Sequence, residues 1–421
     1  MRITRNWRLG LAACLGLWAV VGGGAGLGLV GWGATARADQ AAVQIVLGEM
    51  QRAVLAADVD AYLKHVSASD PVFRKEQENW AADLKLHKPV EFELTIVEPA
   101  AEAADEPAKD GQPASGEKPS RPAREFGPDR AVFTLKTRWT MGEDVGGAAA
   151  KPRDVSFPVV FAREGDGVWR YRGEHWLSVA RPADKETGFA GVLVMHEPGL
   201  EDHAAMVAAV MPEVRSKVDA LFGAKIDRVQ EVKLYSSMRH LQHSIYLSYK
   251  DGLGGWNEPG ESVKILSRGK PRERNLKVLL GHEYGHVATF ELGPKSSSMP
   301  WWVLEGVADF CGGEVVGGDG KGADRTIAQW RDSGALAAWA DLADFRNIKP
   351  ELTRNVYRQG EHFVRWFTSK HGGEVRTAWL REMARGASLE DATKHATGAT
   401  FAEADARWRE AVAALGTPES E

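Results

Sequence analysis

Two histidines and a glutamate stand at a spacing that can hold and use a metal ion. Residues 282–286 read His-Glu-Tyr-Gly-His. On a helix, residues four apart lie one turn apart on the same face, so both imidazoles can reach one ion. Imidazole nitrogens are common zinc ligands, and a glutamate in this pattern can serve as a general base. The segment predicts a zinc site with His282 and His286 as ligands and Glu283 as the catalytic base.

A catalytic zinc site needs a third protein ligand and one open position. Glu305 stands nineteen residues after His286, in a segment that predicts a second helix, since Pro300 suits its first turn and the glycines at 312–313 suit its end. We expect Glu305 to be the third ligand. Asp309 lies one turn further along the same face. It can accept a hydrogen bond from a ligand histidine, or be an ordinary solvated charge on the helix.

Together these residues resemble a known group of enzymes. The pattern His-Glu-x-x-His, eighteen residues, then Glu is that of the gluzincin metallopeptidases. Residues 302–308, Trp-Val-Leu-Glu-Gly-Val-Ala, are similar to the third-ligand helix of the peptidase MA-like branch, W-x-x-E-G-x-A. The same spacing occurs in the aminopeptidases related to leukotriene hydrolase. The resemblance implies a gluzincin-type, mainly helical peptidase domain, one zinc ion and a peptide or protein substrate.

A second match lies downstream, where residues 357–360 read Tyr-Arg-Gln-Gly. This string resembles the Y-x-x-G of both branches, and the resemblance implies that the Tyr357 hydroxyl stabilises the oxyanion of the tetrahedral intermediate. The hydrogen bond from a preorganised donor at that position strengthens as negative charge develops on the oxygen. The alternative is that Tyr357 is a core residue of an amphipathic helix.

The segment before the metal motif departs from the related aminopeptidases. Those enzymes use a G-x-M-E-N strand to bind the free amino end of the substrate, whereas residues 255–261 here read Gly-Trp-Asn-Glu-Pro-Gly-Glu. Glu258 or Glu261 could take the amine-binding role. Because Pro259 cannot donate to a strand ladder, the segment is otherwise a loop before a strand at 263–266. That strand could pair with an extended peptide by edge addition.

The periodicity of apolar residues predicts an α+β protein of two domains. Residues 39–182 contain helices at 41–66 and 73–86, then strands at 90–97, 131–140, 155–163 and 168–179. This order of elements resembles the cone-shaped NTF2-like fold. An insert at 98–128, rich in Ala, Glu, Pro and Lys, predicts a disordered loop. Residues 188–415 form the peptidase domain, with strands at 192–195, 231–235 and 262–266, a helix at 201–222 and mostly helix from 275, and residues 416–421 a disordered tail.

The first 38 residues predict export. Three arginines precede a long apolar, glycine-rich run that ends in Ala-Arg-Ala at 36–38, the pattern of a secretory signal peptide. The alternative is an uncleaved N-terminal membrane anchor. Either places the protein outside the cytoplasm, as a secreted, periplasmic or cell-surface protein. Without this segment Cys311 is the only cysteine, so no disulfide framework is possible.

The net charge of the protein limits the kinds of partner that it can bind. The chain carries a net charge of −5, and residues 39–421 carry 49 basic and 58 acidic residues. An acidic protein has no electrostatic footprint for nucleic acid. The sequence therefore predicts an exported zinc metallopeptidase in which Glu283 acts as general base and Tyr357 stabilises the oxyanion. Two alternatives stay open: a zinc hydrolase of non-peptide amides or esters, and a non-catalytic binding protein of the cell envelope.

Overall fold

The computed structural model describes residues 29–97, 125–126, 129–142, 151–250 and 252–416. Most of the predicted export segment, most of the predicted insert and most of the predicted tail lie outside these residues. The first helix begins at Leu29, so the predicted cleavage site at 36–38 falls within it. Within the described ranges, none of the helices has the length and apolar character needed to cross a bilayer.

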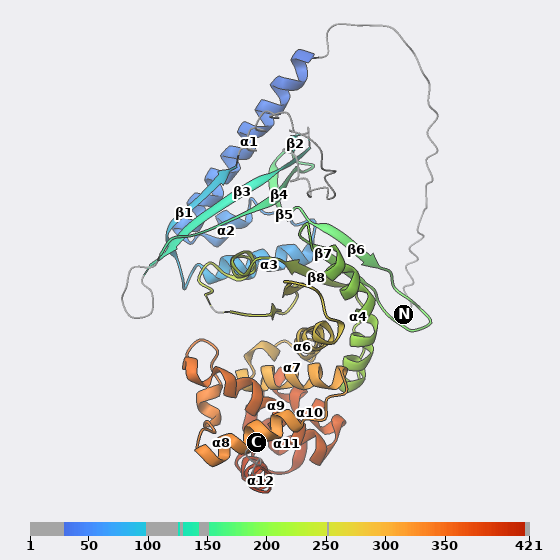
Figure 1. Cartoon of the computed structure of the whole chain (residues 1–421). Coiled ribbons are helices and arrows are strands. Elements are labelled where there is room, and N and C mark those ends of the chain that lie inside the picture. The colour runs from blue at the N-terminus through green and yellow to red at the C-terminus, as the bar shows by residue number, and fades with distance from the viewer. Residues whose placement is uncertain (1–28, 98–124, 127–128, 143–150, 251, 417–421) are drawn as a thin grey trace, which may run out of the picture.

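The N-terminal part packs helices against one face of a curved antiparallel sheet (Figure 1). The sheet has the strand order β1-β3-β4-β5, with the short β2 paired to β3. Its helices are α1 (Leu29–Ala56), α2 (Val59–Leu63) and α3 (Pro71–Asp83). Its strands are β1 (Pro89–Ile96), β2 (Glu125–Phe126), β3 (Arg130–Met141), β4 (Arg153–Arg163) and β5 (Trp169–Glu174).

Local sequence explains where these elements begin and end. The predicted helix 41–66 is two helices, because Ala57 adopts a left-handed φ of 55° and ends α1. Asp58 then caps α2 by accepting a hydrogen bond from the Ala61 amide. Asp70 caps α3 in the same way, and Pro71 fills its first turn. Alternate buried residues along β3 form one side of the core.

The predicted strand 168–179 is wrong as a single element. It divides after Glu174, the last residue of β5, next to Gly173, which has φ of +93° and whose added Cβ would lie 2.9 Å from the ring of Phe73. Only glycine fits such a bend. After it, β6 (Leu177–Arg181) leaves the first sheet and pairs with β7 (Val192–His196) in a second sheet. Residues 177–181, which the sequence assigned to the α+β domain, thus belong to the sheet of the peptidase part.

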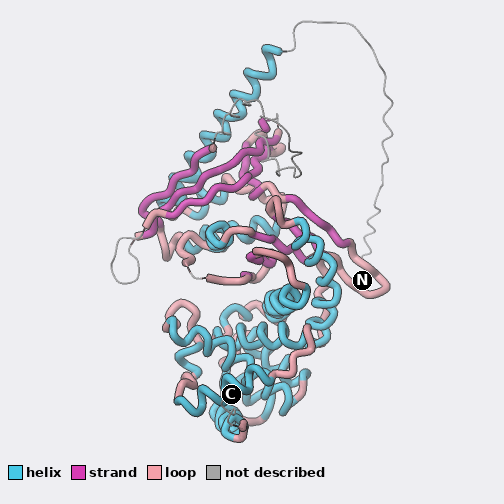
Figure 2. The backbone as a smooth tube through the Cα atoms, in the orientation of Figure 1, coloured by secondary structure: helices cyan, strands magenta, loops and turns pink. Residues whose placement is uncertain are grey.

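The second sheet has the order β6-β7-β8-β10-β9. Figure 2 shows strands of both sheets in magenta in the upper part of the view, above the helices of the C-terminal part. Strands β7, β8 (Gln230–Tyr235) and β10 (Val263–Leu266) are parallel, and β9 (Gly255–Trp256) runs antiparallel at the edge. The crossover from β7 to β8 is α4 (Glu201–Phe222), and α5 (Met238–Ile245) follows β8. The prediction that strand 263–266 forms an open edge is wrong, because the chain folds back so that Trp256 pairs with Lys264.

The remainder is helical, as the periodicity predicts. It comprises α6 (Glu273–Phe290), α7 (Trp301–Val315), α8 (Lys321–Ser333), α9 (Thr353–His371), α10 (Gly373–Ala384), α11 (Leu389–Thr397) and α12 (Phe401–Ala413). Short 3₁₀ turns lie at Ser296–Ser298, Trp339–Leu342 and Pro350–Leu352. The core is aromatic, with Trp302, Phe363, Trp379 and Trp408 fully buried. The molecule is mixed helix and sheet, in agreement with the α+β prediction.

Glycines let the three helices that carry the site approach closely. An added Cβ at Gly285 of α6 would lie 3.0 Å from the Cβ of Cys311 on α7. An added Cβ at Gly306 of α7 would lie 2.5 Å from the carbonyl carbon of Gly360 on α9. Small residues at helix crossings allow backbones to come near contact, because no side chain stands between them. The close approach fixes α7 between α6 and α9.

Candidate metal centre

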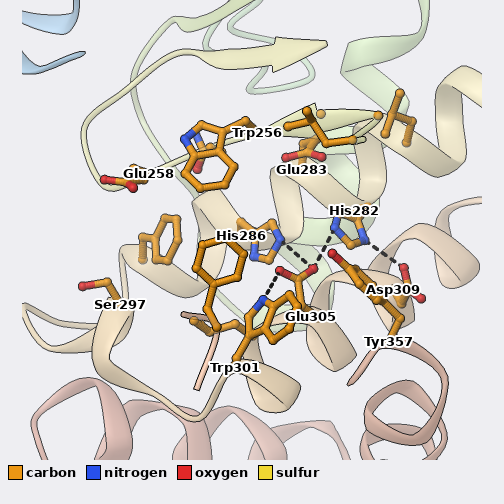
Figure 3. A pocket seen from close by; sticks show the side chains of 18 of the residues that line it. Trp256, Glu258, His282, Glu283, His286, Ser297, Trp301, Glu305, Asp309 and Tyr357 are labelled. Atoms are coloured by element: carbon orange, nitrogen blue, oxygen red, sulfur yellow. Dashed lines mark hydrogen bonds and ion pairs between the residues drawn. The ribbon is translucent and has the colours of Figure 1, made fainter. Parts of the chain in front are cut away.

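The two motif histidines face the same point in space. His282 and His286 lie on one face of α6, with ring centroids 4.9 Å apart. The Nε2 atom of His282 lies 3.3 Å from Glu305 Oε2, and that of His286 lies 3.5 Å from the same oxygen. Figure 3 shows the three side chains converging from α6 and α7. Helix spacing predicted this convergence, and the close packing of α6 on α7 brings Glu305 into it.

The spacing of these atoms fits a tetrahedral zinc ion. Zinc bonds of about 2.0–2.1 Å place tetrahedral ligand atoms about 3.3 Å apart. The two nitrogen–oxygen distances of 3.3 and 3.5 Å match this value. In the described part of the chain, these three residues form a group of potential metal ligands whose ligand atoms all lie within 4.8 Å of one another. Two imidazoles and one carboxylate, with a position left open, are a catalytic rather than a structural donor set.

Glu305 is held in place by a residue that sequence reasoning missed. The indole Nε1–H of Trp301 donates to Glu305 Oε1 over 2.8 Å, which leaves Oε2 directed at the imidazoles. Burial opposes ionisation of Glu305, but the attraction of His286 and His282 outweighs it and lowers the pKa of this carboxyl strongly. The signal was available, because Trp301 stands four residues before Glu305, one turn away on the same helix face.

Asp309 takes the position expected of a supporting residue. Its Oδ1 lies 2.9 Å from Nδ1 of His282 (Figure 3), and Arg358 lies 3.8 Å from its other oxygen. A carboxylate that accepts the Nδ1–H leaves the Nε2 lone pair free to bind a metal. The pKa of His282 rises well above its ordinary value, because Asp309 and Glu305 outweigh the effect of burial. Nδ1 of His286 is buried and has no such partner among the described residues.

Glu283 lies against the edge strand, on the flank of the metal ligands. Its side chain is 3% exposed, and a Cβ added at Gly255 would lie 2.7 Å from its Cδ. Burial raises the pKa of Glu283 above the ordinary value for glutamate, although His282 and His286 oppose this rise. A carboxylate with a raised pKa accepts a proton from water more readily near neutral pH. The missing side chain at Gly255 is what gives Glu283 its space.

Tyr357 enters the site from α9. Its ring lies 6.2 Å from that of His282 and 6.0 Å from that of Trp301, and Figure 3 shows the side chain beside the ligands. Burial and the nearby Glu305 raise the pKa of the phenol, so the hydroxyl keeps its proton and can donate it in a hydrogen bond. Tyr357 is half-buried and lines the cavity, which is the placement that the resemblance implied.

These residues share one cavity of about 1050 Å³. A row of aromatic rings lines it, from Tyr246 and Trp256 beside the edge strand, through Phe345, to Trp301 and Tyr357. Pockets of this size accommodate ligands of several residues or a drug-sized molecule. The combination of apolar walls with a few convergent polar groups is typical of a binding site for an organic substrate.

The two predicted amine-binding glutamates have different surroundings. Glu258 lines the cavity, accepts a hydrogen bond from the Tyr246 hydroxyl, and has a pKa raised by burial and by Glu261. Glu261 lies outside the cavity wall, 3.0 Å from Lys264 and 2.7 Å from Asn79. Its carboxylate is therefore committed to contacts inside the protein. Of the two, Glu258 alone has access to a substrate.

Two other residues considered from the sequence, His362 and Cys311, lie in the protein interior. His362 is buried and accepts the indole N–H of Trp408 over 2.9 Å. Cys311 is buried, and burial raises the pKa of its thiol to about 12, so it is no nucleophile. Sequence reasoning missed Lys75 and Asn79, two residues of α3 that line the cavity from the α+β domain. They carry no motif, and only the docking of the two domains reveals them.

Comparisons with known proteins do not place the chain in a family. No protein-family model and no curated protein matches it. Among solved structures it is similar to an M1 zinc metallopeptidase from Deinococcus radiodurans, with 14% identity, TM-score 0.35, and coverage of 72% of this chain and 73% of that one. It is also similar to aminopeptidase A from Legionella pneumophila (10% identity, TM-score 0.37, coverage 66% and 47%) and to an aminopeptidase N family protein from Idiomarina loihiensis (13%, 0.38, 70% and 54%). The chain spans about half the length of the last two proteins.

Proposed function

We propose that this protein is an exported zinc-dependent metallopeptidase of the gluzincin type, close to the peptidase MA-like branch. The observation that carries the proposal is the convergence of His282, His286 and Glu305 at tetrahedral spacing, beside the buried Glu283. The cavity of about 1050 Å³ around them has room for a peptide. Export rests on the N-terminal segment. Its test is the N-terminal sequence of the protein recovered from cell fractions, which distinguishes cleavage at 38 from retention of an anchor.

His282, His286 and Glu305 would hold one zinc ion. When bound, zinc polarises a carbonyl group and makes water a stronger acid. Glu283 takes a proton from the attacking water and passes it to the leaving amine, since its raised pKa suits both transfers. The protonated Tyr357 hydroxyl donates to the oxygen on which negative charge develops. Asp309 holds the imidazole of His282 in the tautomer that leaves Nε2 unprotonated.

Glu258 favours exopeptidase activity within this proposal. It is a largely buried carboxylate on the cavity wall, with a pKa raised by burial. Loss of hydration at such a group is compensated when it pairs with an ammonium group of the substrate. A free amino terminus supplies that group. Cut positions restricted to the first residue of a peptide would support this role, and internal cuts would leave Glu258 as part of the wall.

The decisive experiment replaces Glu283 by Gln in the full chain. The zinc-loaded variant should keep its metal and lose turnover, because the amide cannot carry the proton. The matched control is Glu273→Gln, an exposed glutamate in the first turn of the same helix. Both are incubated with a complex peptide library and with small amides and esters, and products are identified by mass spectrometry. Peptidase activity that persists in Glu283→Gln overturns the assignment, and hydrolysis of small amides or esters alone favours the non-peptide alternative.

A further inference from the structure

The α+β domain reaches into the catalytic cavity. Lys75 and Asn79 of α3 are part of its lining, together with residues of α6, α7 and α9. Asn79 donates to Glu261 over 2.7 Å, which ties α3 to the loop after the edge strand. The stem of Lys75 lies along the same loop, since a Cβ added at Gly260 would lie 3.2 Å from its Cγ. The first domain thus forms one wall of the site.

Lys75 brings to this wall a positive charge that forms no ion pair within the described residues. The two buried lysines of the domain interface are paired, Lys233 with Glu76 at 2.5 Å and Lys264 with Glu261 at 3.0 Å. Lys75 is partly buried and forms no ion pair within the described part of the chain. Glu258 on the same wall lies near enough for the charge of Lys75 to act on it, but its hydrogen bond comes from the Tyr246 hydroxyl. The ammonium group of Lys75 is therefore available to a ligand.

The same domain also holds the segment that precedes this wall. Side chains of the α+β domain donate hydrogen bonds to three carbonyl groups, one in the last turn of α5 and two in the segment after it. Trp80 Nε1 donates to the His243 carbonyl over 2.9 Å, Trp139 Nε1 to that of Leu247 over 3.0 Å, and Arg153 Nη1 to that of Tyr249 over 2.6 Å.

This segment leads directly into the cavity wall. The side chain of Leu247 is buried in the core of the α+β domain, not in that of the peptidase part. Residues 252–258, which follow, line the cavity and include the edge strand β9 beside Glu283. A shift of residues 243–249 would therefore displace the wall formed by residues 252–258 and weaken its contacts with a substrate.

We propose that the α+β domain is a working part of the substrate site, in which Lys75 is a specificity-determining residue for a carboxylate of the substrate and Arg153 is a positioning residue for the edge-strand wall. The proposal rests on the proposed peptidase function. The ammonium group of Lys75 would bind this carboxylate in the part of the cavity that Glu258 also lines. Arg153 acts through the carbonyls of Tyr249 and Leu247, which lie 2.6 and 3.5 Å from its Nη1, and it does not line the cavity.

The role of Lys75 is tested by binding, so that turnover is not needed. Zinc-loaded full-length Glu283→Gln protein, with and without Lys75→Met, is titrated calorimetrically with matched peptides. The two peptides of the first pair differ only in a C-terminal carboxylate or a C-terminal amide. The two peptides of the second pair differ only in having Asp or Asn at one position. A charge-assisted hydrogen bond predicts that Lys75→Met weakens binding of one acidic peptide about tenfold and leaves its neutral partner unchanged. The pair that responds identifies the carboxylate as terminal or as a side chain.

The control is Lys85→Met, an exposed lysine two residues after α3. Equal losses for acidic and neutral peptides, or no loss, overturn the role of Lys75. Because affinity is measured in a variant without turnover, these outcomes are independent of catalysis. Peptide hydrolysis by the wild type with no effect of Lys75→Met refutes this proposal alone. Peptide binding without any hydrolysis by the wild type refutes the peptidase function instead.

The role of Arg153 is tested by steady-state kinetics. Arg153→Met should raise KM severalfold with kcat and zinc content nearly unchanged, because it loosens a substrate-binding wall and leaves the metal ligands in place. Lys136→Met is the control, since Lys136 lies on the neighbouring strand and pairs with the exposed Asp154. An unchanged KM, or a KM that rises equally in both variants, overturns the positioning role. Partial rescue of KM by Arg153→Lys supports it.

Discussion

Asp309 offers a sharp test of the proposed metal centre, because it would support zinc binding without touching zinc. Its Oδ1 lies 2.9 Å from Nδ1 of His282, while Nδ1 of His286 has no partner in the described structure. Among the two histidines, orientation by hydrogen bonding thus depends on one contact. Loss of such a contact lowers metal affinity by about 10- to 100-fold, or about 1.4–2.7 kcal/mol.

Two variants separate the charge of Asp309 from its geometry. Asp309→Asn keeps an oxygen that can accept the Nδ1–H, so its loss should lie near the lower limit of about tenfold. Asp309→Ala removes the acceptor and should lie near the upper limit of about 100-fold. Asp319→Ala is the control, because Asp319 is exposed and pairs with Lys321. Zinc affinity is measured by competition with a chromogenic chelator. Wild-type affinity in the Ala variant, or a larger loss in Asn than in Ala, would refute the reasoning.

Three further predictions concern catalysis, packing and pH. Tyr357→Phe should lower kcat by about 10²–10³ with little change in KM, as for other oxyanion donors, and an unchanged kcat contradicts its role. Gly306→Ala should destabilise the fold by about 1–3 kcal/mol, because its Cβ would overlap the backbone of Gly360; an unaltered Tm in a thermal melt contradicts this packing. Burial lowers the pKa of His240, but the carboxylates of Glu174 at 3.6 Å and Glu197 at 2.6 Å raise it to about 9. This contribution to stability is complete below about pH 6.5 and is lost as the pH rises through 9, so the stability of His240→Gln should fall less than that of the wild type across this interval in chemical denaturation.

The metal centre was predictable because its geometry is local. His282 and His286 share one helix face by their spacing alone, and Asp309 shares a face with Glu305 for the same reason. That the two helices pack against each other was inferred from the need of a catalytic zinc site for a third ligand, and the resemblance to a known group implied the same. The physical cause of that packing is small residues, such as Gly285 opposite Cys311. Nothing in the periodicity of either helix specifies which glycine meets which helix.

The division of strand 168–179 was not predictable from periodicity. Residues on both sides of Gly173 have strand character, and alternation of apolar residues does not say which sheet a strand joins. The bend depends on the ring of Phe73, one hundred residues earlier, which leaves no room for a Cβ. The edge position of β9 was missed for a similar reason. Two residues, Gly255 and Trp256, are too few to show a period of two.

The cavity wall formed by the α+β domain could not be predicted from the sequence, because the charged residues that pair at the interface between the two domains are far apart in the chain. Glu76 and Lys233 are 157 residues apart, and each separately is a charge that belongs on a solvated surface. When the fold brings these two side chains together, burial opposes the charge on each of them. Their mutual attraction outweighs burial, and it lowers the pKa of Glu76 and raises that of Lys233. Removing one partner of such a pair costs about 3–5 kcal/mol, since the other charge stays buried alone. The domains are therefore docked by contacts that tolerate little displacement, which is what a shared substrate wall requires.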